Sequence, residues 1–301
     1  MDAASIAKIR KTILPVIVRK GNEVACIGTA FVISSAGRSA LLVTAEHVTA
    51  VFSELEEPDK LHHPSSPFFV EKALTVLKKV QPYVVWFDAD LGPQVALVKS
   101  TVSMKAADLS CMVATFVDHV PEQIAFEYSM SLDTTPVQEG ETVYAVGYPN
   151  MDFAGYANGD NQMSGQLHWP KGEVLEFYPQ GGPTGQKTPC FSVSAGLPHG
   201  MSGGPVITQD DAGDMYVRGI VRSDFADQFA TTSSGQALAT AIWPLLLLPF
   251  NPPNEQGQID WSKTLLDLQK LGSIVDKGDA SSRINAVRDS EGYILDAQYH
   301  F

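Results

Sequence analysis

The chain has few cysteines, little positive charge and no long apolar run, and each scarcity excludes a class of protein. Its three cysteines are odd in number and form no paired metal-binding motif. Lysine and arginine total 21 against 34 aspartates and glutamates, so the net charge of −13 argues against general nucleic-acid binding. The most apolar stretch, Ala241–Phe250, is too short to span a membrane and holds two prolines. We therefore expect no nucleic acid, membrane, metal or organic cofactor as a partner.

The residues that are abundant indicate a β protein. Glycine occurs 24 times and proline 19 times, which is typical of many short strands joined by turns. Hydrophobic residues make up 44% of the 301 positions, enough to bury a sizeable core. The first eleven residues carry charges throughout and lack the apolar run of a signal peptide; they predict a short amphipathic helix.

The most informative motif is Gly-Met-Ser-Gly-Gly-Pro at Gly200–Pro205. A glycine-rich turn can expose the Ser202 hydroxyl and aim neighbouring N–H groups at one point, and a serine nucleophile needs both. A tight turn with an incidental serine is the plainer alternative. The motif also fits the nucleophile elbow of α/β-hydrolases, but that elbow runs into a helix. Here two glycines and a proline follow, and Val206–Thr208 and Met215–Val221 predict a hairpin.

A serine nucleophile needs a base and a carboxylate, and two residues fit these roles. His47 follows the apolar, strand-forming run Ala40–Val43, which predicts an imidazole at the end of a buried strand, although a lone histidine is more often structural. Asp108 lies among small and apolar residues, and a buried carboxylate is costly unless it is paired, for example with a histidine N–H. Asp88 and Asp90 are rivals, but their sequence indicates a strand end and a turn.

The order His47, Asp108, Ser202 and the motifs around them resemble the trypsin/chymotrypsin-like serine peptidases, especially the bacterial Deg/HtrA-type branch. Gly28–Ile33 is similar to the strand before the histidine strand of that branch, and Val143–Pro149 to the strand that opens its second barrel. The resemblance implies an all-β fold of two six-stranded antiparallel barrels, with a short N-terminal helix and a helical C-terminal extension. The expected protease domain is 1–250, with barrels at about 15–135 and 136–250 and an extension at 251–301.

The resemblance also implies roles for these residues. Ser202 would attack the scissile carbonyl, His47 would carry the proton, and Asp108 would orient the imidazole. The backbone N–H groups of Gly200 and Ser202 would form the oxyanion hole. Met201 replaces the aspartate that digestive members pair with a freed N-terminus, so we expect no N-terminal cleavage to be required. By motif position, the substrate pocket would involve Pro198, His199, Arg222, Ser223 and Asp224.

The segments outside the shared motifs carry separate expectations. Residues 70–80 have helical character, and Gly155–Gly165 could be a loop that gates the site. After Phe250, the remaining 51 residues are too few for a PDZ domain. Their apolar spacing over Trp261–Val275 predicts a helix, and Ile284–Val287 with Tyr293–Leu295 predicts a small hairpin. Packing of this extension on the barrels is favoured over docking of a regulatory protein partner.

These observations favour a serine endopeptidase that hydrolyses protein or peptide substrates, of unknown oligomeric state. A catalytically silent protease-fold scaffold is the alternative. Secreted members of the resembled family are usually disulfide-stapled, whereas this chain has an odd number of cysteines. We therefore expect a reducing compartment, most simply the bacterial cytoplasm.

Overall fold

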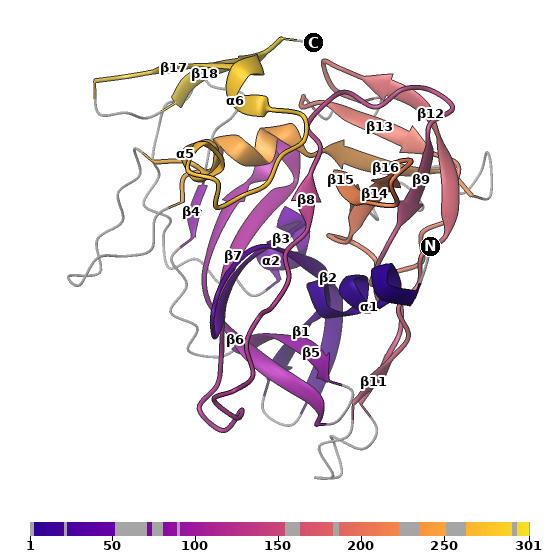
Figure 1. The fold of residues 1–301 in the computed structure, drawn as a ribbon, viewed down its shortest axis with the longest axis vertical. Coiled ribbons are helices and arrows are strands. Elements are labelled where there is room, and N and C mark those ends of the chain that lie inside the picture. Colours follow the sequence, from indigo (N-terminus) through magenta and orange to yellow (C-terminus); the bar gives the residue numbers. More distant parts are fainter. Residues whose placement is uncertain are drawn as a thin grey trace.

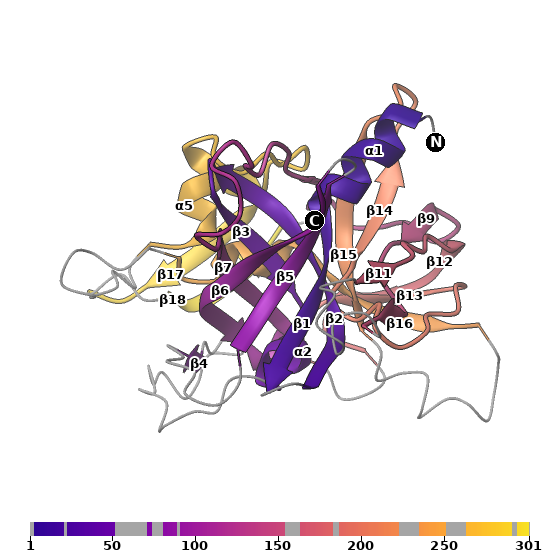
Figure 2. The same ribbon diagram turned by 90° about the horizontal axis from the view of Figure 1, so that it is seen from below.

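The computed structural model describes residues 3–20, 23–51, 71–73, 81–88, 91–153, 163–182, 187–222, 235–250, 263–290 and 294–300. Two β-barrels lie side by side, the first drawn in indigo to magenta and the second in salmon to orange (Figures 1 and 2). The C-terminal segment, in yellow, packs at one end of the pair. None of the described helices is long and apolar enough to cross a membrane.

The first barrel is a closed ring of six antiparallel strands in the order β5-β1-β2-β3-β7-β6. Apolar residues that alternate along these strands, such as Leu14, Val16 and Val32, point inward and are fully buried. A short strand, β4, pairs with β6 outside the ring. The strands are β1 (Ile13–Lys20), β2 (Glu23–Ala36), β3 (Ser39–Thr44), β4 (Glu71–Ala73), β5 (Gln81–Asp88), β6 (Gly92–Met104) and β7 (Leu109–Phe116).

The second barrel closes in the order β14-β9-β12-β13-β16-β15. Its strands are β9 (Thr142–Ala145), β12 (Lys171–Tyr178), β13 (Cys190–Val193), β14 (Pro205–Gln209), β15 (Met215–Arg222) and β16 (Ala237–Ala241). β14 and β15 form the hairpin predicted after Ser202. A parallel strand, β8 (Ser131–Leu132), adds to β15, and β10 (Met151–Asp152) pairs with β11 (Ser164–Gly165) beside the barrel. The expectation of two six-stranded antiparallel barrels is confirmed.

Helices occupy the ends and the links. The predicted N-terminal helix is α1 (Ala3–Thr12), and short helices follow three strands: α2 (Glu46–Ala50), η1 (Lys105–Ala107) and η2 (Trp243–Leu247). The C-terminal extension holds α5 (Leu265–Lys270), α6 (Ala280–Arg283) and the hairpin β17 (Ile284–Arg288) with β18 (Ile294–Tyr299). One apolar cluster joins α1, both barrels, η2 and this extension.

Two predicted helices differ from the structure. Over 70–80, residues 71–73 form β4 instead, because their backbone pairs with β6; residues 74–80 lie outside the described part. In the extension, α5 ends at Lys270, so Leu271 and Val275 are 78% and 57% exposed rather than continuing an apolar face. Gly272, with φ +75, turns the chain there and lets Ile274 pack inward. Of the predicted gating loop, only 163–165 is described.

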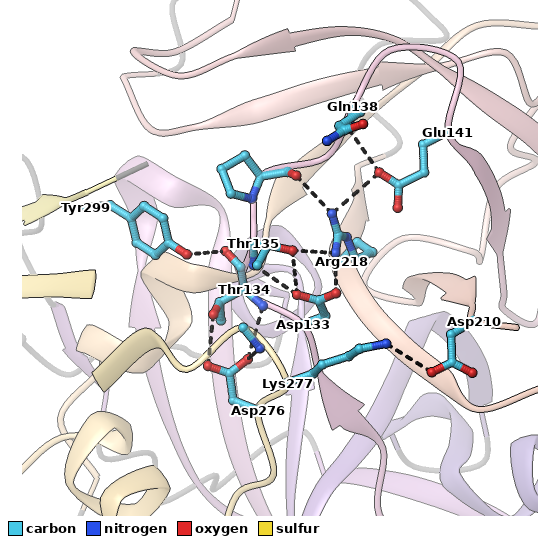
Figure 3. A network of polar contacts seen from close by, with 12 residues as sticks. Asp133, Thr134, Thr135, Gln138, Glu141, Asp210, Arg218, Asp276, Lys277 and Tyr299 are labelled. Atoms are coloured by element: carbon cyan, nitrogen blue, oxygen red, sulfur yellow. Dashed lines mark hydrogen bonds and ion pairs between the residues drawn. The ribbon is translucent and has the colours of Figure 1, made fainter. Parts of the chain in front are cut away.

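A polar network fixes the extension to the segment that links the two barrels (Figure 3). Arg218 on β15 forms a buried ion pair with Asp133 and donates to Thr135 Oγ1 at 2.7 Å. The Asp276 carboxylate accepts from the N–H and the hydroxyl of Thr134, at 3.1 and 2.8 Å. The Tyr299 hydroxyl donates to the Thr134 carbonyl at 2.7 Å. The extension therefore packs on the barrels, while docking of a regulatory partner stays a prediction.

Candidate active site

His47 lies where the first barrel gives way to a helix. The buried strand β3 ends at Thr44, Ala45 is still extended at φ −74 and ψ 150, and α2 begins at Glu46. Of the apolar residues of β3 that predicted a buried strand, Ala40 and Leu42 lie in the core of the first barrel, and Leu41 and Val43 lie in the cluster that joins the barrels. The imidazole therefore projects from a rigid strand end, in the first turn of α2, with 29% of its side chain exposed.

Asp108 is the carboxylate that meets this imidazole. It follows η1 in the left-handed region, at φ 52, and is 4% exposed. His47 Nδ1 lies 2.9 Å from Oδ1 and 3.0 Å from Oδ2, and the His47 backbone N–H donates to Oδ1 at 3.1 Å. A carboxylate here favours the tautomer with hydrogen on Nδ1, which leaves the Nε2 lone pair to act as a base. The rival Asp88 ends β5 opposite Gly92, and Asp90 lies outside the described residues.

The second barrel holds the helical turn that carries Asp108. Thr188 Oγ1 donates to the Ala106 carbonyl at 3.2 Å, and Thr240 Oγ1 donates to the Ala107 carbonyl at 3.0 Å. Arg222, the last residue of β15, places Nε 2.9 Å from Asp108 Oδ2. The carboxylate therefore lies between an imidazole and a guanidinium, one from each barrel.

Ser202 lies in a turn where the backbone conformation and the close packing require glycine. Met201 N–H donates to the Pro198 carbonyl at 3.3 Å, and Gly200 has φ +88, as the third position of a type II turn requires. A Cβ on Gly200 would lie 2.6 Å from the Tyr148 carbonyl oxygen, so no larger residue fits. Gly203, with φ +82, packs so tightly that a Cβ would collide with the Thr44 hydroxyl. The loop that carries Ser202 is thus pressed against the strand end that carries His47.

Thr29 on β2 anchors this turn from the other barrel. Its N–H donates to the Ser202 carbonyl at 2.8 Å, and its hydroxyl donates to the Gly200 carbonyl at 2.7 Å. The same hydroxyl accepts from the Tyr148 N–H at 2.9 Å. Thr29 is completely buried, so these bonds have no competition from bulk water.

The turn leaves two donors available. Within the part of the chain that the structure describes, neither the Gly200 N–H nor the Ser202 N–H donates to a protein acceptor, whereas those of Met201, Gly203 and Gly204 do. Ser202 is 4% exposed, and its hydroxyl makes no hydrogen bond to a described residue. Catalytic hydrogen bonds are often long until substrate is bound. Two free N–H groups beside a serine can bind a developing oxyanion.

A cavity of about 1230 Å³ adjoins this turn. Pro198, Met201 and Gly196 form one wall, while Tyr148, Trp169 and the α1 residue Arg10 form others. Of the predicted pocket residues, Pro198 therefore lines a cavity, His199 is exposed, and Arg222 lies against Asp108. Ser223 and Asp224 lie outside the described residues, and the substrate pocket stays a prediction.

Two residues of the site were not identified from the sequence in the roles that they have here. The motif Gly28–Ile33 predicts a strand but assigns no role to Thr29, although a hydroxyl between Gly28 and Ala30 in an apolar strand is a signal for a buried polar contact. The sequence predicts Arg222 in the substrate pocket. Its contact with Asp108 depends on how the two barrels meet, which no local pattern encodes.

The chain is similar to several solved structures. One is the Rv3671c protease from M. tuberculosis in its active form, with 18% sequence identity over 80% of this chain and 82% of that chain and a TM-score of 0.43. Deg5 (16%, 79% and 90%, TM-score 0.47) and the HtrA-type protease AlgW with a decapeptide (16%, 79% and 63%, TM-score 0.47) are also similar. These are likenesses of fold alone.

No curated protein matches the chain significantly. The sequence model of the trypsin-like peptidase domain matches residues 28–215, which is more than half of the chain. That range includes the strands and turns that hold His47, Asp108 and Ser202. The chain therefore belongs to the trypsin-like peptidase family.

Proposed function

We propose that the protein is a serine endopeptidase that hydrolyses peptide bonds in protein or peptide substrates. The observation that carries the proposal is the His47–Asp108 pair, with Nδ1 2.9 Å from the carboxylate, packed against the turn of Ser202. In that turn the N–H groups of Gly200 and Ser202 have no acceptor among the described residues. Membership of the trypsin-like peptidase family supports the same reaction.

The chemistry follows from these positions. Ser202 Oγ attacks the scissile carbonyl while His47 Nε2 takes its proton, and Asp108 keeps the imidazole oriented and stabilises the imidazolium. The tetrahedral oxyanion accepts hydrogen bonds from the Gly200 and Ser202 N–H groups. Each such donor lowers the barrier by about 3 kcal/mol in related chemistry. The imidazolium then gives its proton to the leaving amine, and water repeats the sequence to release the acyl group.

A silent scaffold is the second candidate. It would keep the barrels and the cavity but would have no reason to keep the oxyanion donors free of protein acceptors. Asp108 also holds a left-handed backbone conformation that residues other than glycine rarely adopt, at φ 52. Backbone strain of this kind clusters at functional sites, and this favours catalysis.

A serine-directed fluorophosphonate tests the reaction directly. We expect covalent labelling of the folded wild type, none of Ser202→Ala, and loss of labelling by about a thousandfold or more in His47→Ala. Asp108→Asn should weaken labelling strongly, whereas Asp88→Asn, its matched control at the end of β5, should not. Equal labelling of wild type and Ser202→Ala, or none of the folded wild type, would refute the proposal.

A proteomic cleavage screen with the Ser202→Ala protein as control would identify the bonds that are cut.

We also propose a reducing compartment, most simply the bacterial cytoplasm. The support is that Cys26, Cys111 and Cys190 are all free thiols.

A further inference from the structure

The Asp108 carboxylate is shared between two cationic or potentially cationic groups. His47 Nδ1 lies 2.9 Å from Oδ1, and Arg222 Nε lies 2.9 Å from Oδ2. The Arg222 side chain is 17% exposed and that of Asp108 is 6% exposed, so the ion pair is largely removed from water. A guanidinium keeps its charge at every pH at which a protein is folded. A permanent cation therefore neighbours the group that stabilises the His47 imidazolium.

We propose that Arg222 is a positioning residue of the triad: it fixes the Asp108 carboxylate and shares its charge, so that His47 stays neutral, and able to act as a base, at lower pH. The inference rests on the proposed peptidase function and adds a determinant of its working pH. It also gives Arg222 a role other than selecting substrate side chains.

The direction of the effect follows from electrostatics. Asp108 alone favours the imidazolium, because an opposite charge within a few ångströms stabilises the charged form. The positive charge of Arg222 offsets part of that attraction and also repels the imidazolium. Removing the guanidinium should therefore raise the midpoint of His47 protonation by about one pH unit at the dielectric typical of partly buried sites.

The described elements beside the pair carry other charged and titratable groups. Glu46 precedes His47 on α2 and is half-buried, and Lys99 on β6 and Lys105 on η1 are exposed to solvent. Cys190 opens β13 near Arg222; burial raises the pKa of its thiol to about 12, although Arg222 lowers it, so the thiol is neutral at physiological pH. Among the residues that the structure describes, Arg222 is therefore the cation in the best position to act on the triad.

The test is a titration of the His47 imidazole by ¹⁵N-histidine NMR in the full chain, with Ser202→Ala to prevent self-cleavage and His47→Gln to assign the signal. We compare Arg222→Gln, Arg222→Lys and the matched surface control Lys105→Gln. We expect the glutamine variant to raise the His47 midpoint by about one pH unit. The lysine variant, which keeps the charge, and the surface control should stay within a few tenths of a unit.

An unchanged or lowered midpoint in Arg222→Gln would overturn the proposal. Should that variant fail to fold, Arg222→Met, which fills similar volume without charge, answers the same question. If both neutral variants unfold while the lysine variant folds, Arg222 is a structural ion-pair residue and the proposal is wrong.

The NMR readout is independent of turnover, so it separates this proposal from the proposed function. Absence of fluorophosphonate labelling in the wild type would refute the proposed peptidase activity, whatever the midpoint of the His47 titration. With an active enzyme, the acidic limb of the kcat/KM profile should move to higher pH in Arg222→Gln by the same amount as the His47 midpoint.

Discussion

Removing the hydroxyl of Thr29 should weaken the proposed oxyanion hole without changing a side chain that would contact substrate. That hydroxyl donates to the Gly200 carbonyl at 2.7 Å and accepts from the Tyr148 N–H at 2.9 Å. Thr29→Val keeps the shape and the β-branched side chain but leaves both backbone groups without this partner. It also replaces a polar contact with an apolar methyl group at a fully buried position.

The magnitude follows from these two bonds. A buried backbone group left without a partner costs about 1–3 kcal/mol, so the two together should lower the free energy of unfolding by about 2–6 kcal/mol. The Gly200 N–H belongs to the turn that loses its anchor. Complete loss of one oxyanion donor costs about 3 kcal/mol of barrier, so a loosened turn should lower kcat by about tenfold to a hundredfold. KM should change less, because the donor acts chiefly in the transition state.

The assay combines urea unfolding with fluorophosphonate labelling rates, or with kcat once a substrate is known. Thr29→Ser keeps the hydroxyl and should recover most of both losses. Thr12→Val is the matched control, since Thr12 is equally buried and its hydroxyl donates to the Lys8 carbonyl at 3.0 Å, in α1. It should lower stability but leave labelling unchanged. Equal labelling of Thr29→Val and Thr29→Ser would refute the assigned anchoring role.

Two further predictions concern stability. Asp276→Ala removes the acceptor of two Thr134 bonds and of the Gly278 and Ala280 N–H groups, so urea unfolding should show a loss of about 2–3 kcal/mol. Its neighbour Lys277→Ala breaks an exposed ion pair with Asp210 and a cation–π contact with Tyr216, and should change the midpoint less; equal effects would contradict the network's role. Burial raises the pKa of Cys26 to about 11 and that of Cys190 to about 12, whereas thiols of an unfolded chain ionise near pH 8.5. The unfolded chain therefore releases these protons first, so stability should fall between about pH 9 and pH 11. Urea midpoints should fall over that range, and fall less in Cys190→Ala; a rise would contradict the assignment.

Much of the fold could be predicted because its signals are local. The strands that form the barrels alternate or run apolar over short stretches, and the hairpin of β14 and β15 begins at Pro205, which a helix interior does not tolerate. Of the helix expected over 261–275, residues 261–262 lie outside the described part, and only Leu265–Lys270 are helical, because Gly272 turns the chain and lets Ile274 pack inward. The spacing of apolar residues alone cannot show where such a turn comes.

The candidate site could be predicted where a residue lies directly before or after a strand that the local sequence indicates. His47 follows β3 and Asp108 precedes β7, and these two strands pair directly, with Thr44 opposite Ser110. The contact between His47 and Asp108 therefore joins two residues of the first barrel, while their catalytic roles stay a prediction. The contacts of Thr29 and Arg222 depend on how the barrels meet, and they join residues 171 and 114 positions apart from their partners. No periodicity within either strand encodes such a contact.

Each barrel anchors the functional residue of the other. The first barrel contributes His47 and Asp108, yet Thr29 of that barrel holds the turn of Ser202. The second barrel contributes Ser202, yet its Thr188, Thr240 and Arg222 hold η1 and the Asp108 that follows it. Because these contacts cross the interface in both directions, the relative position of the barrels is fixed where the proposed reaction would need it. Substitutions at this interface should therefore lower kcat by more than their effect on stability would suggest, since a small shift of either barrel separates nucleophile from base.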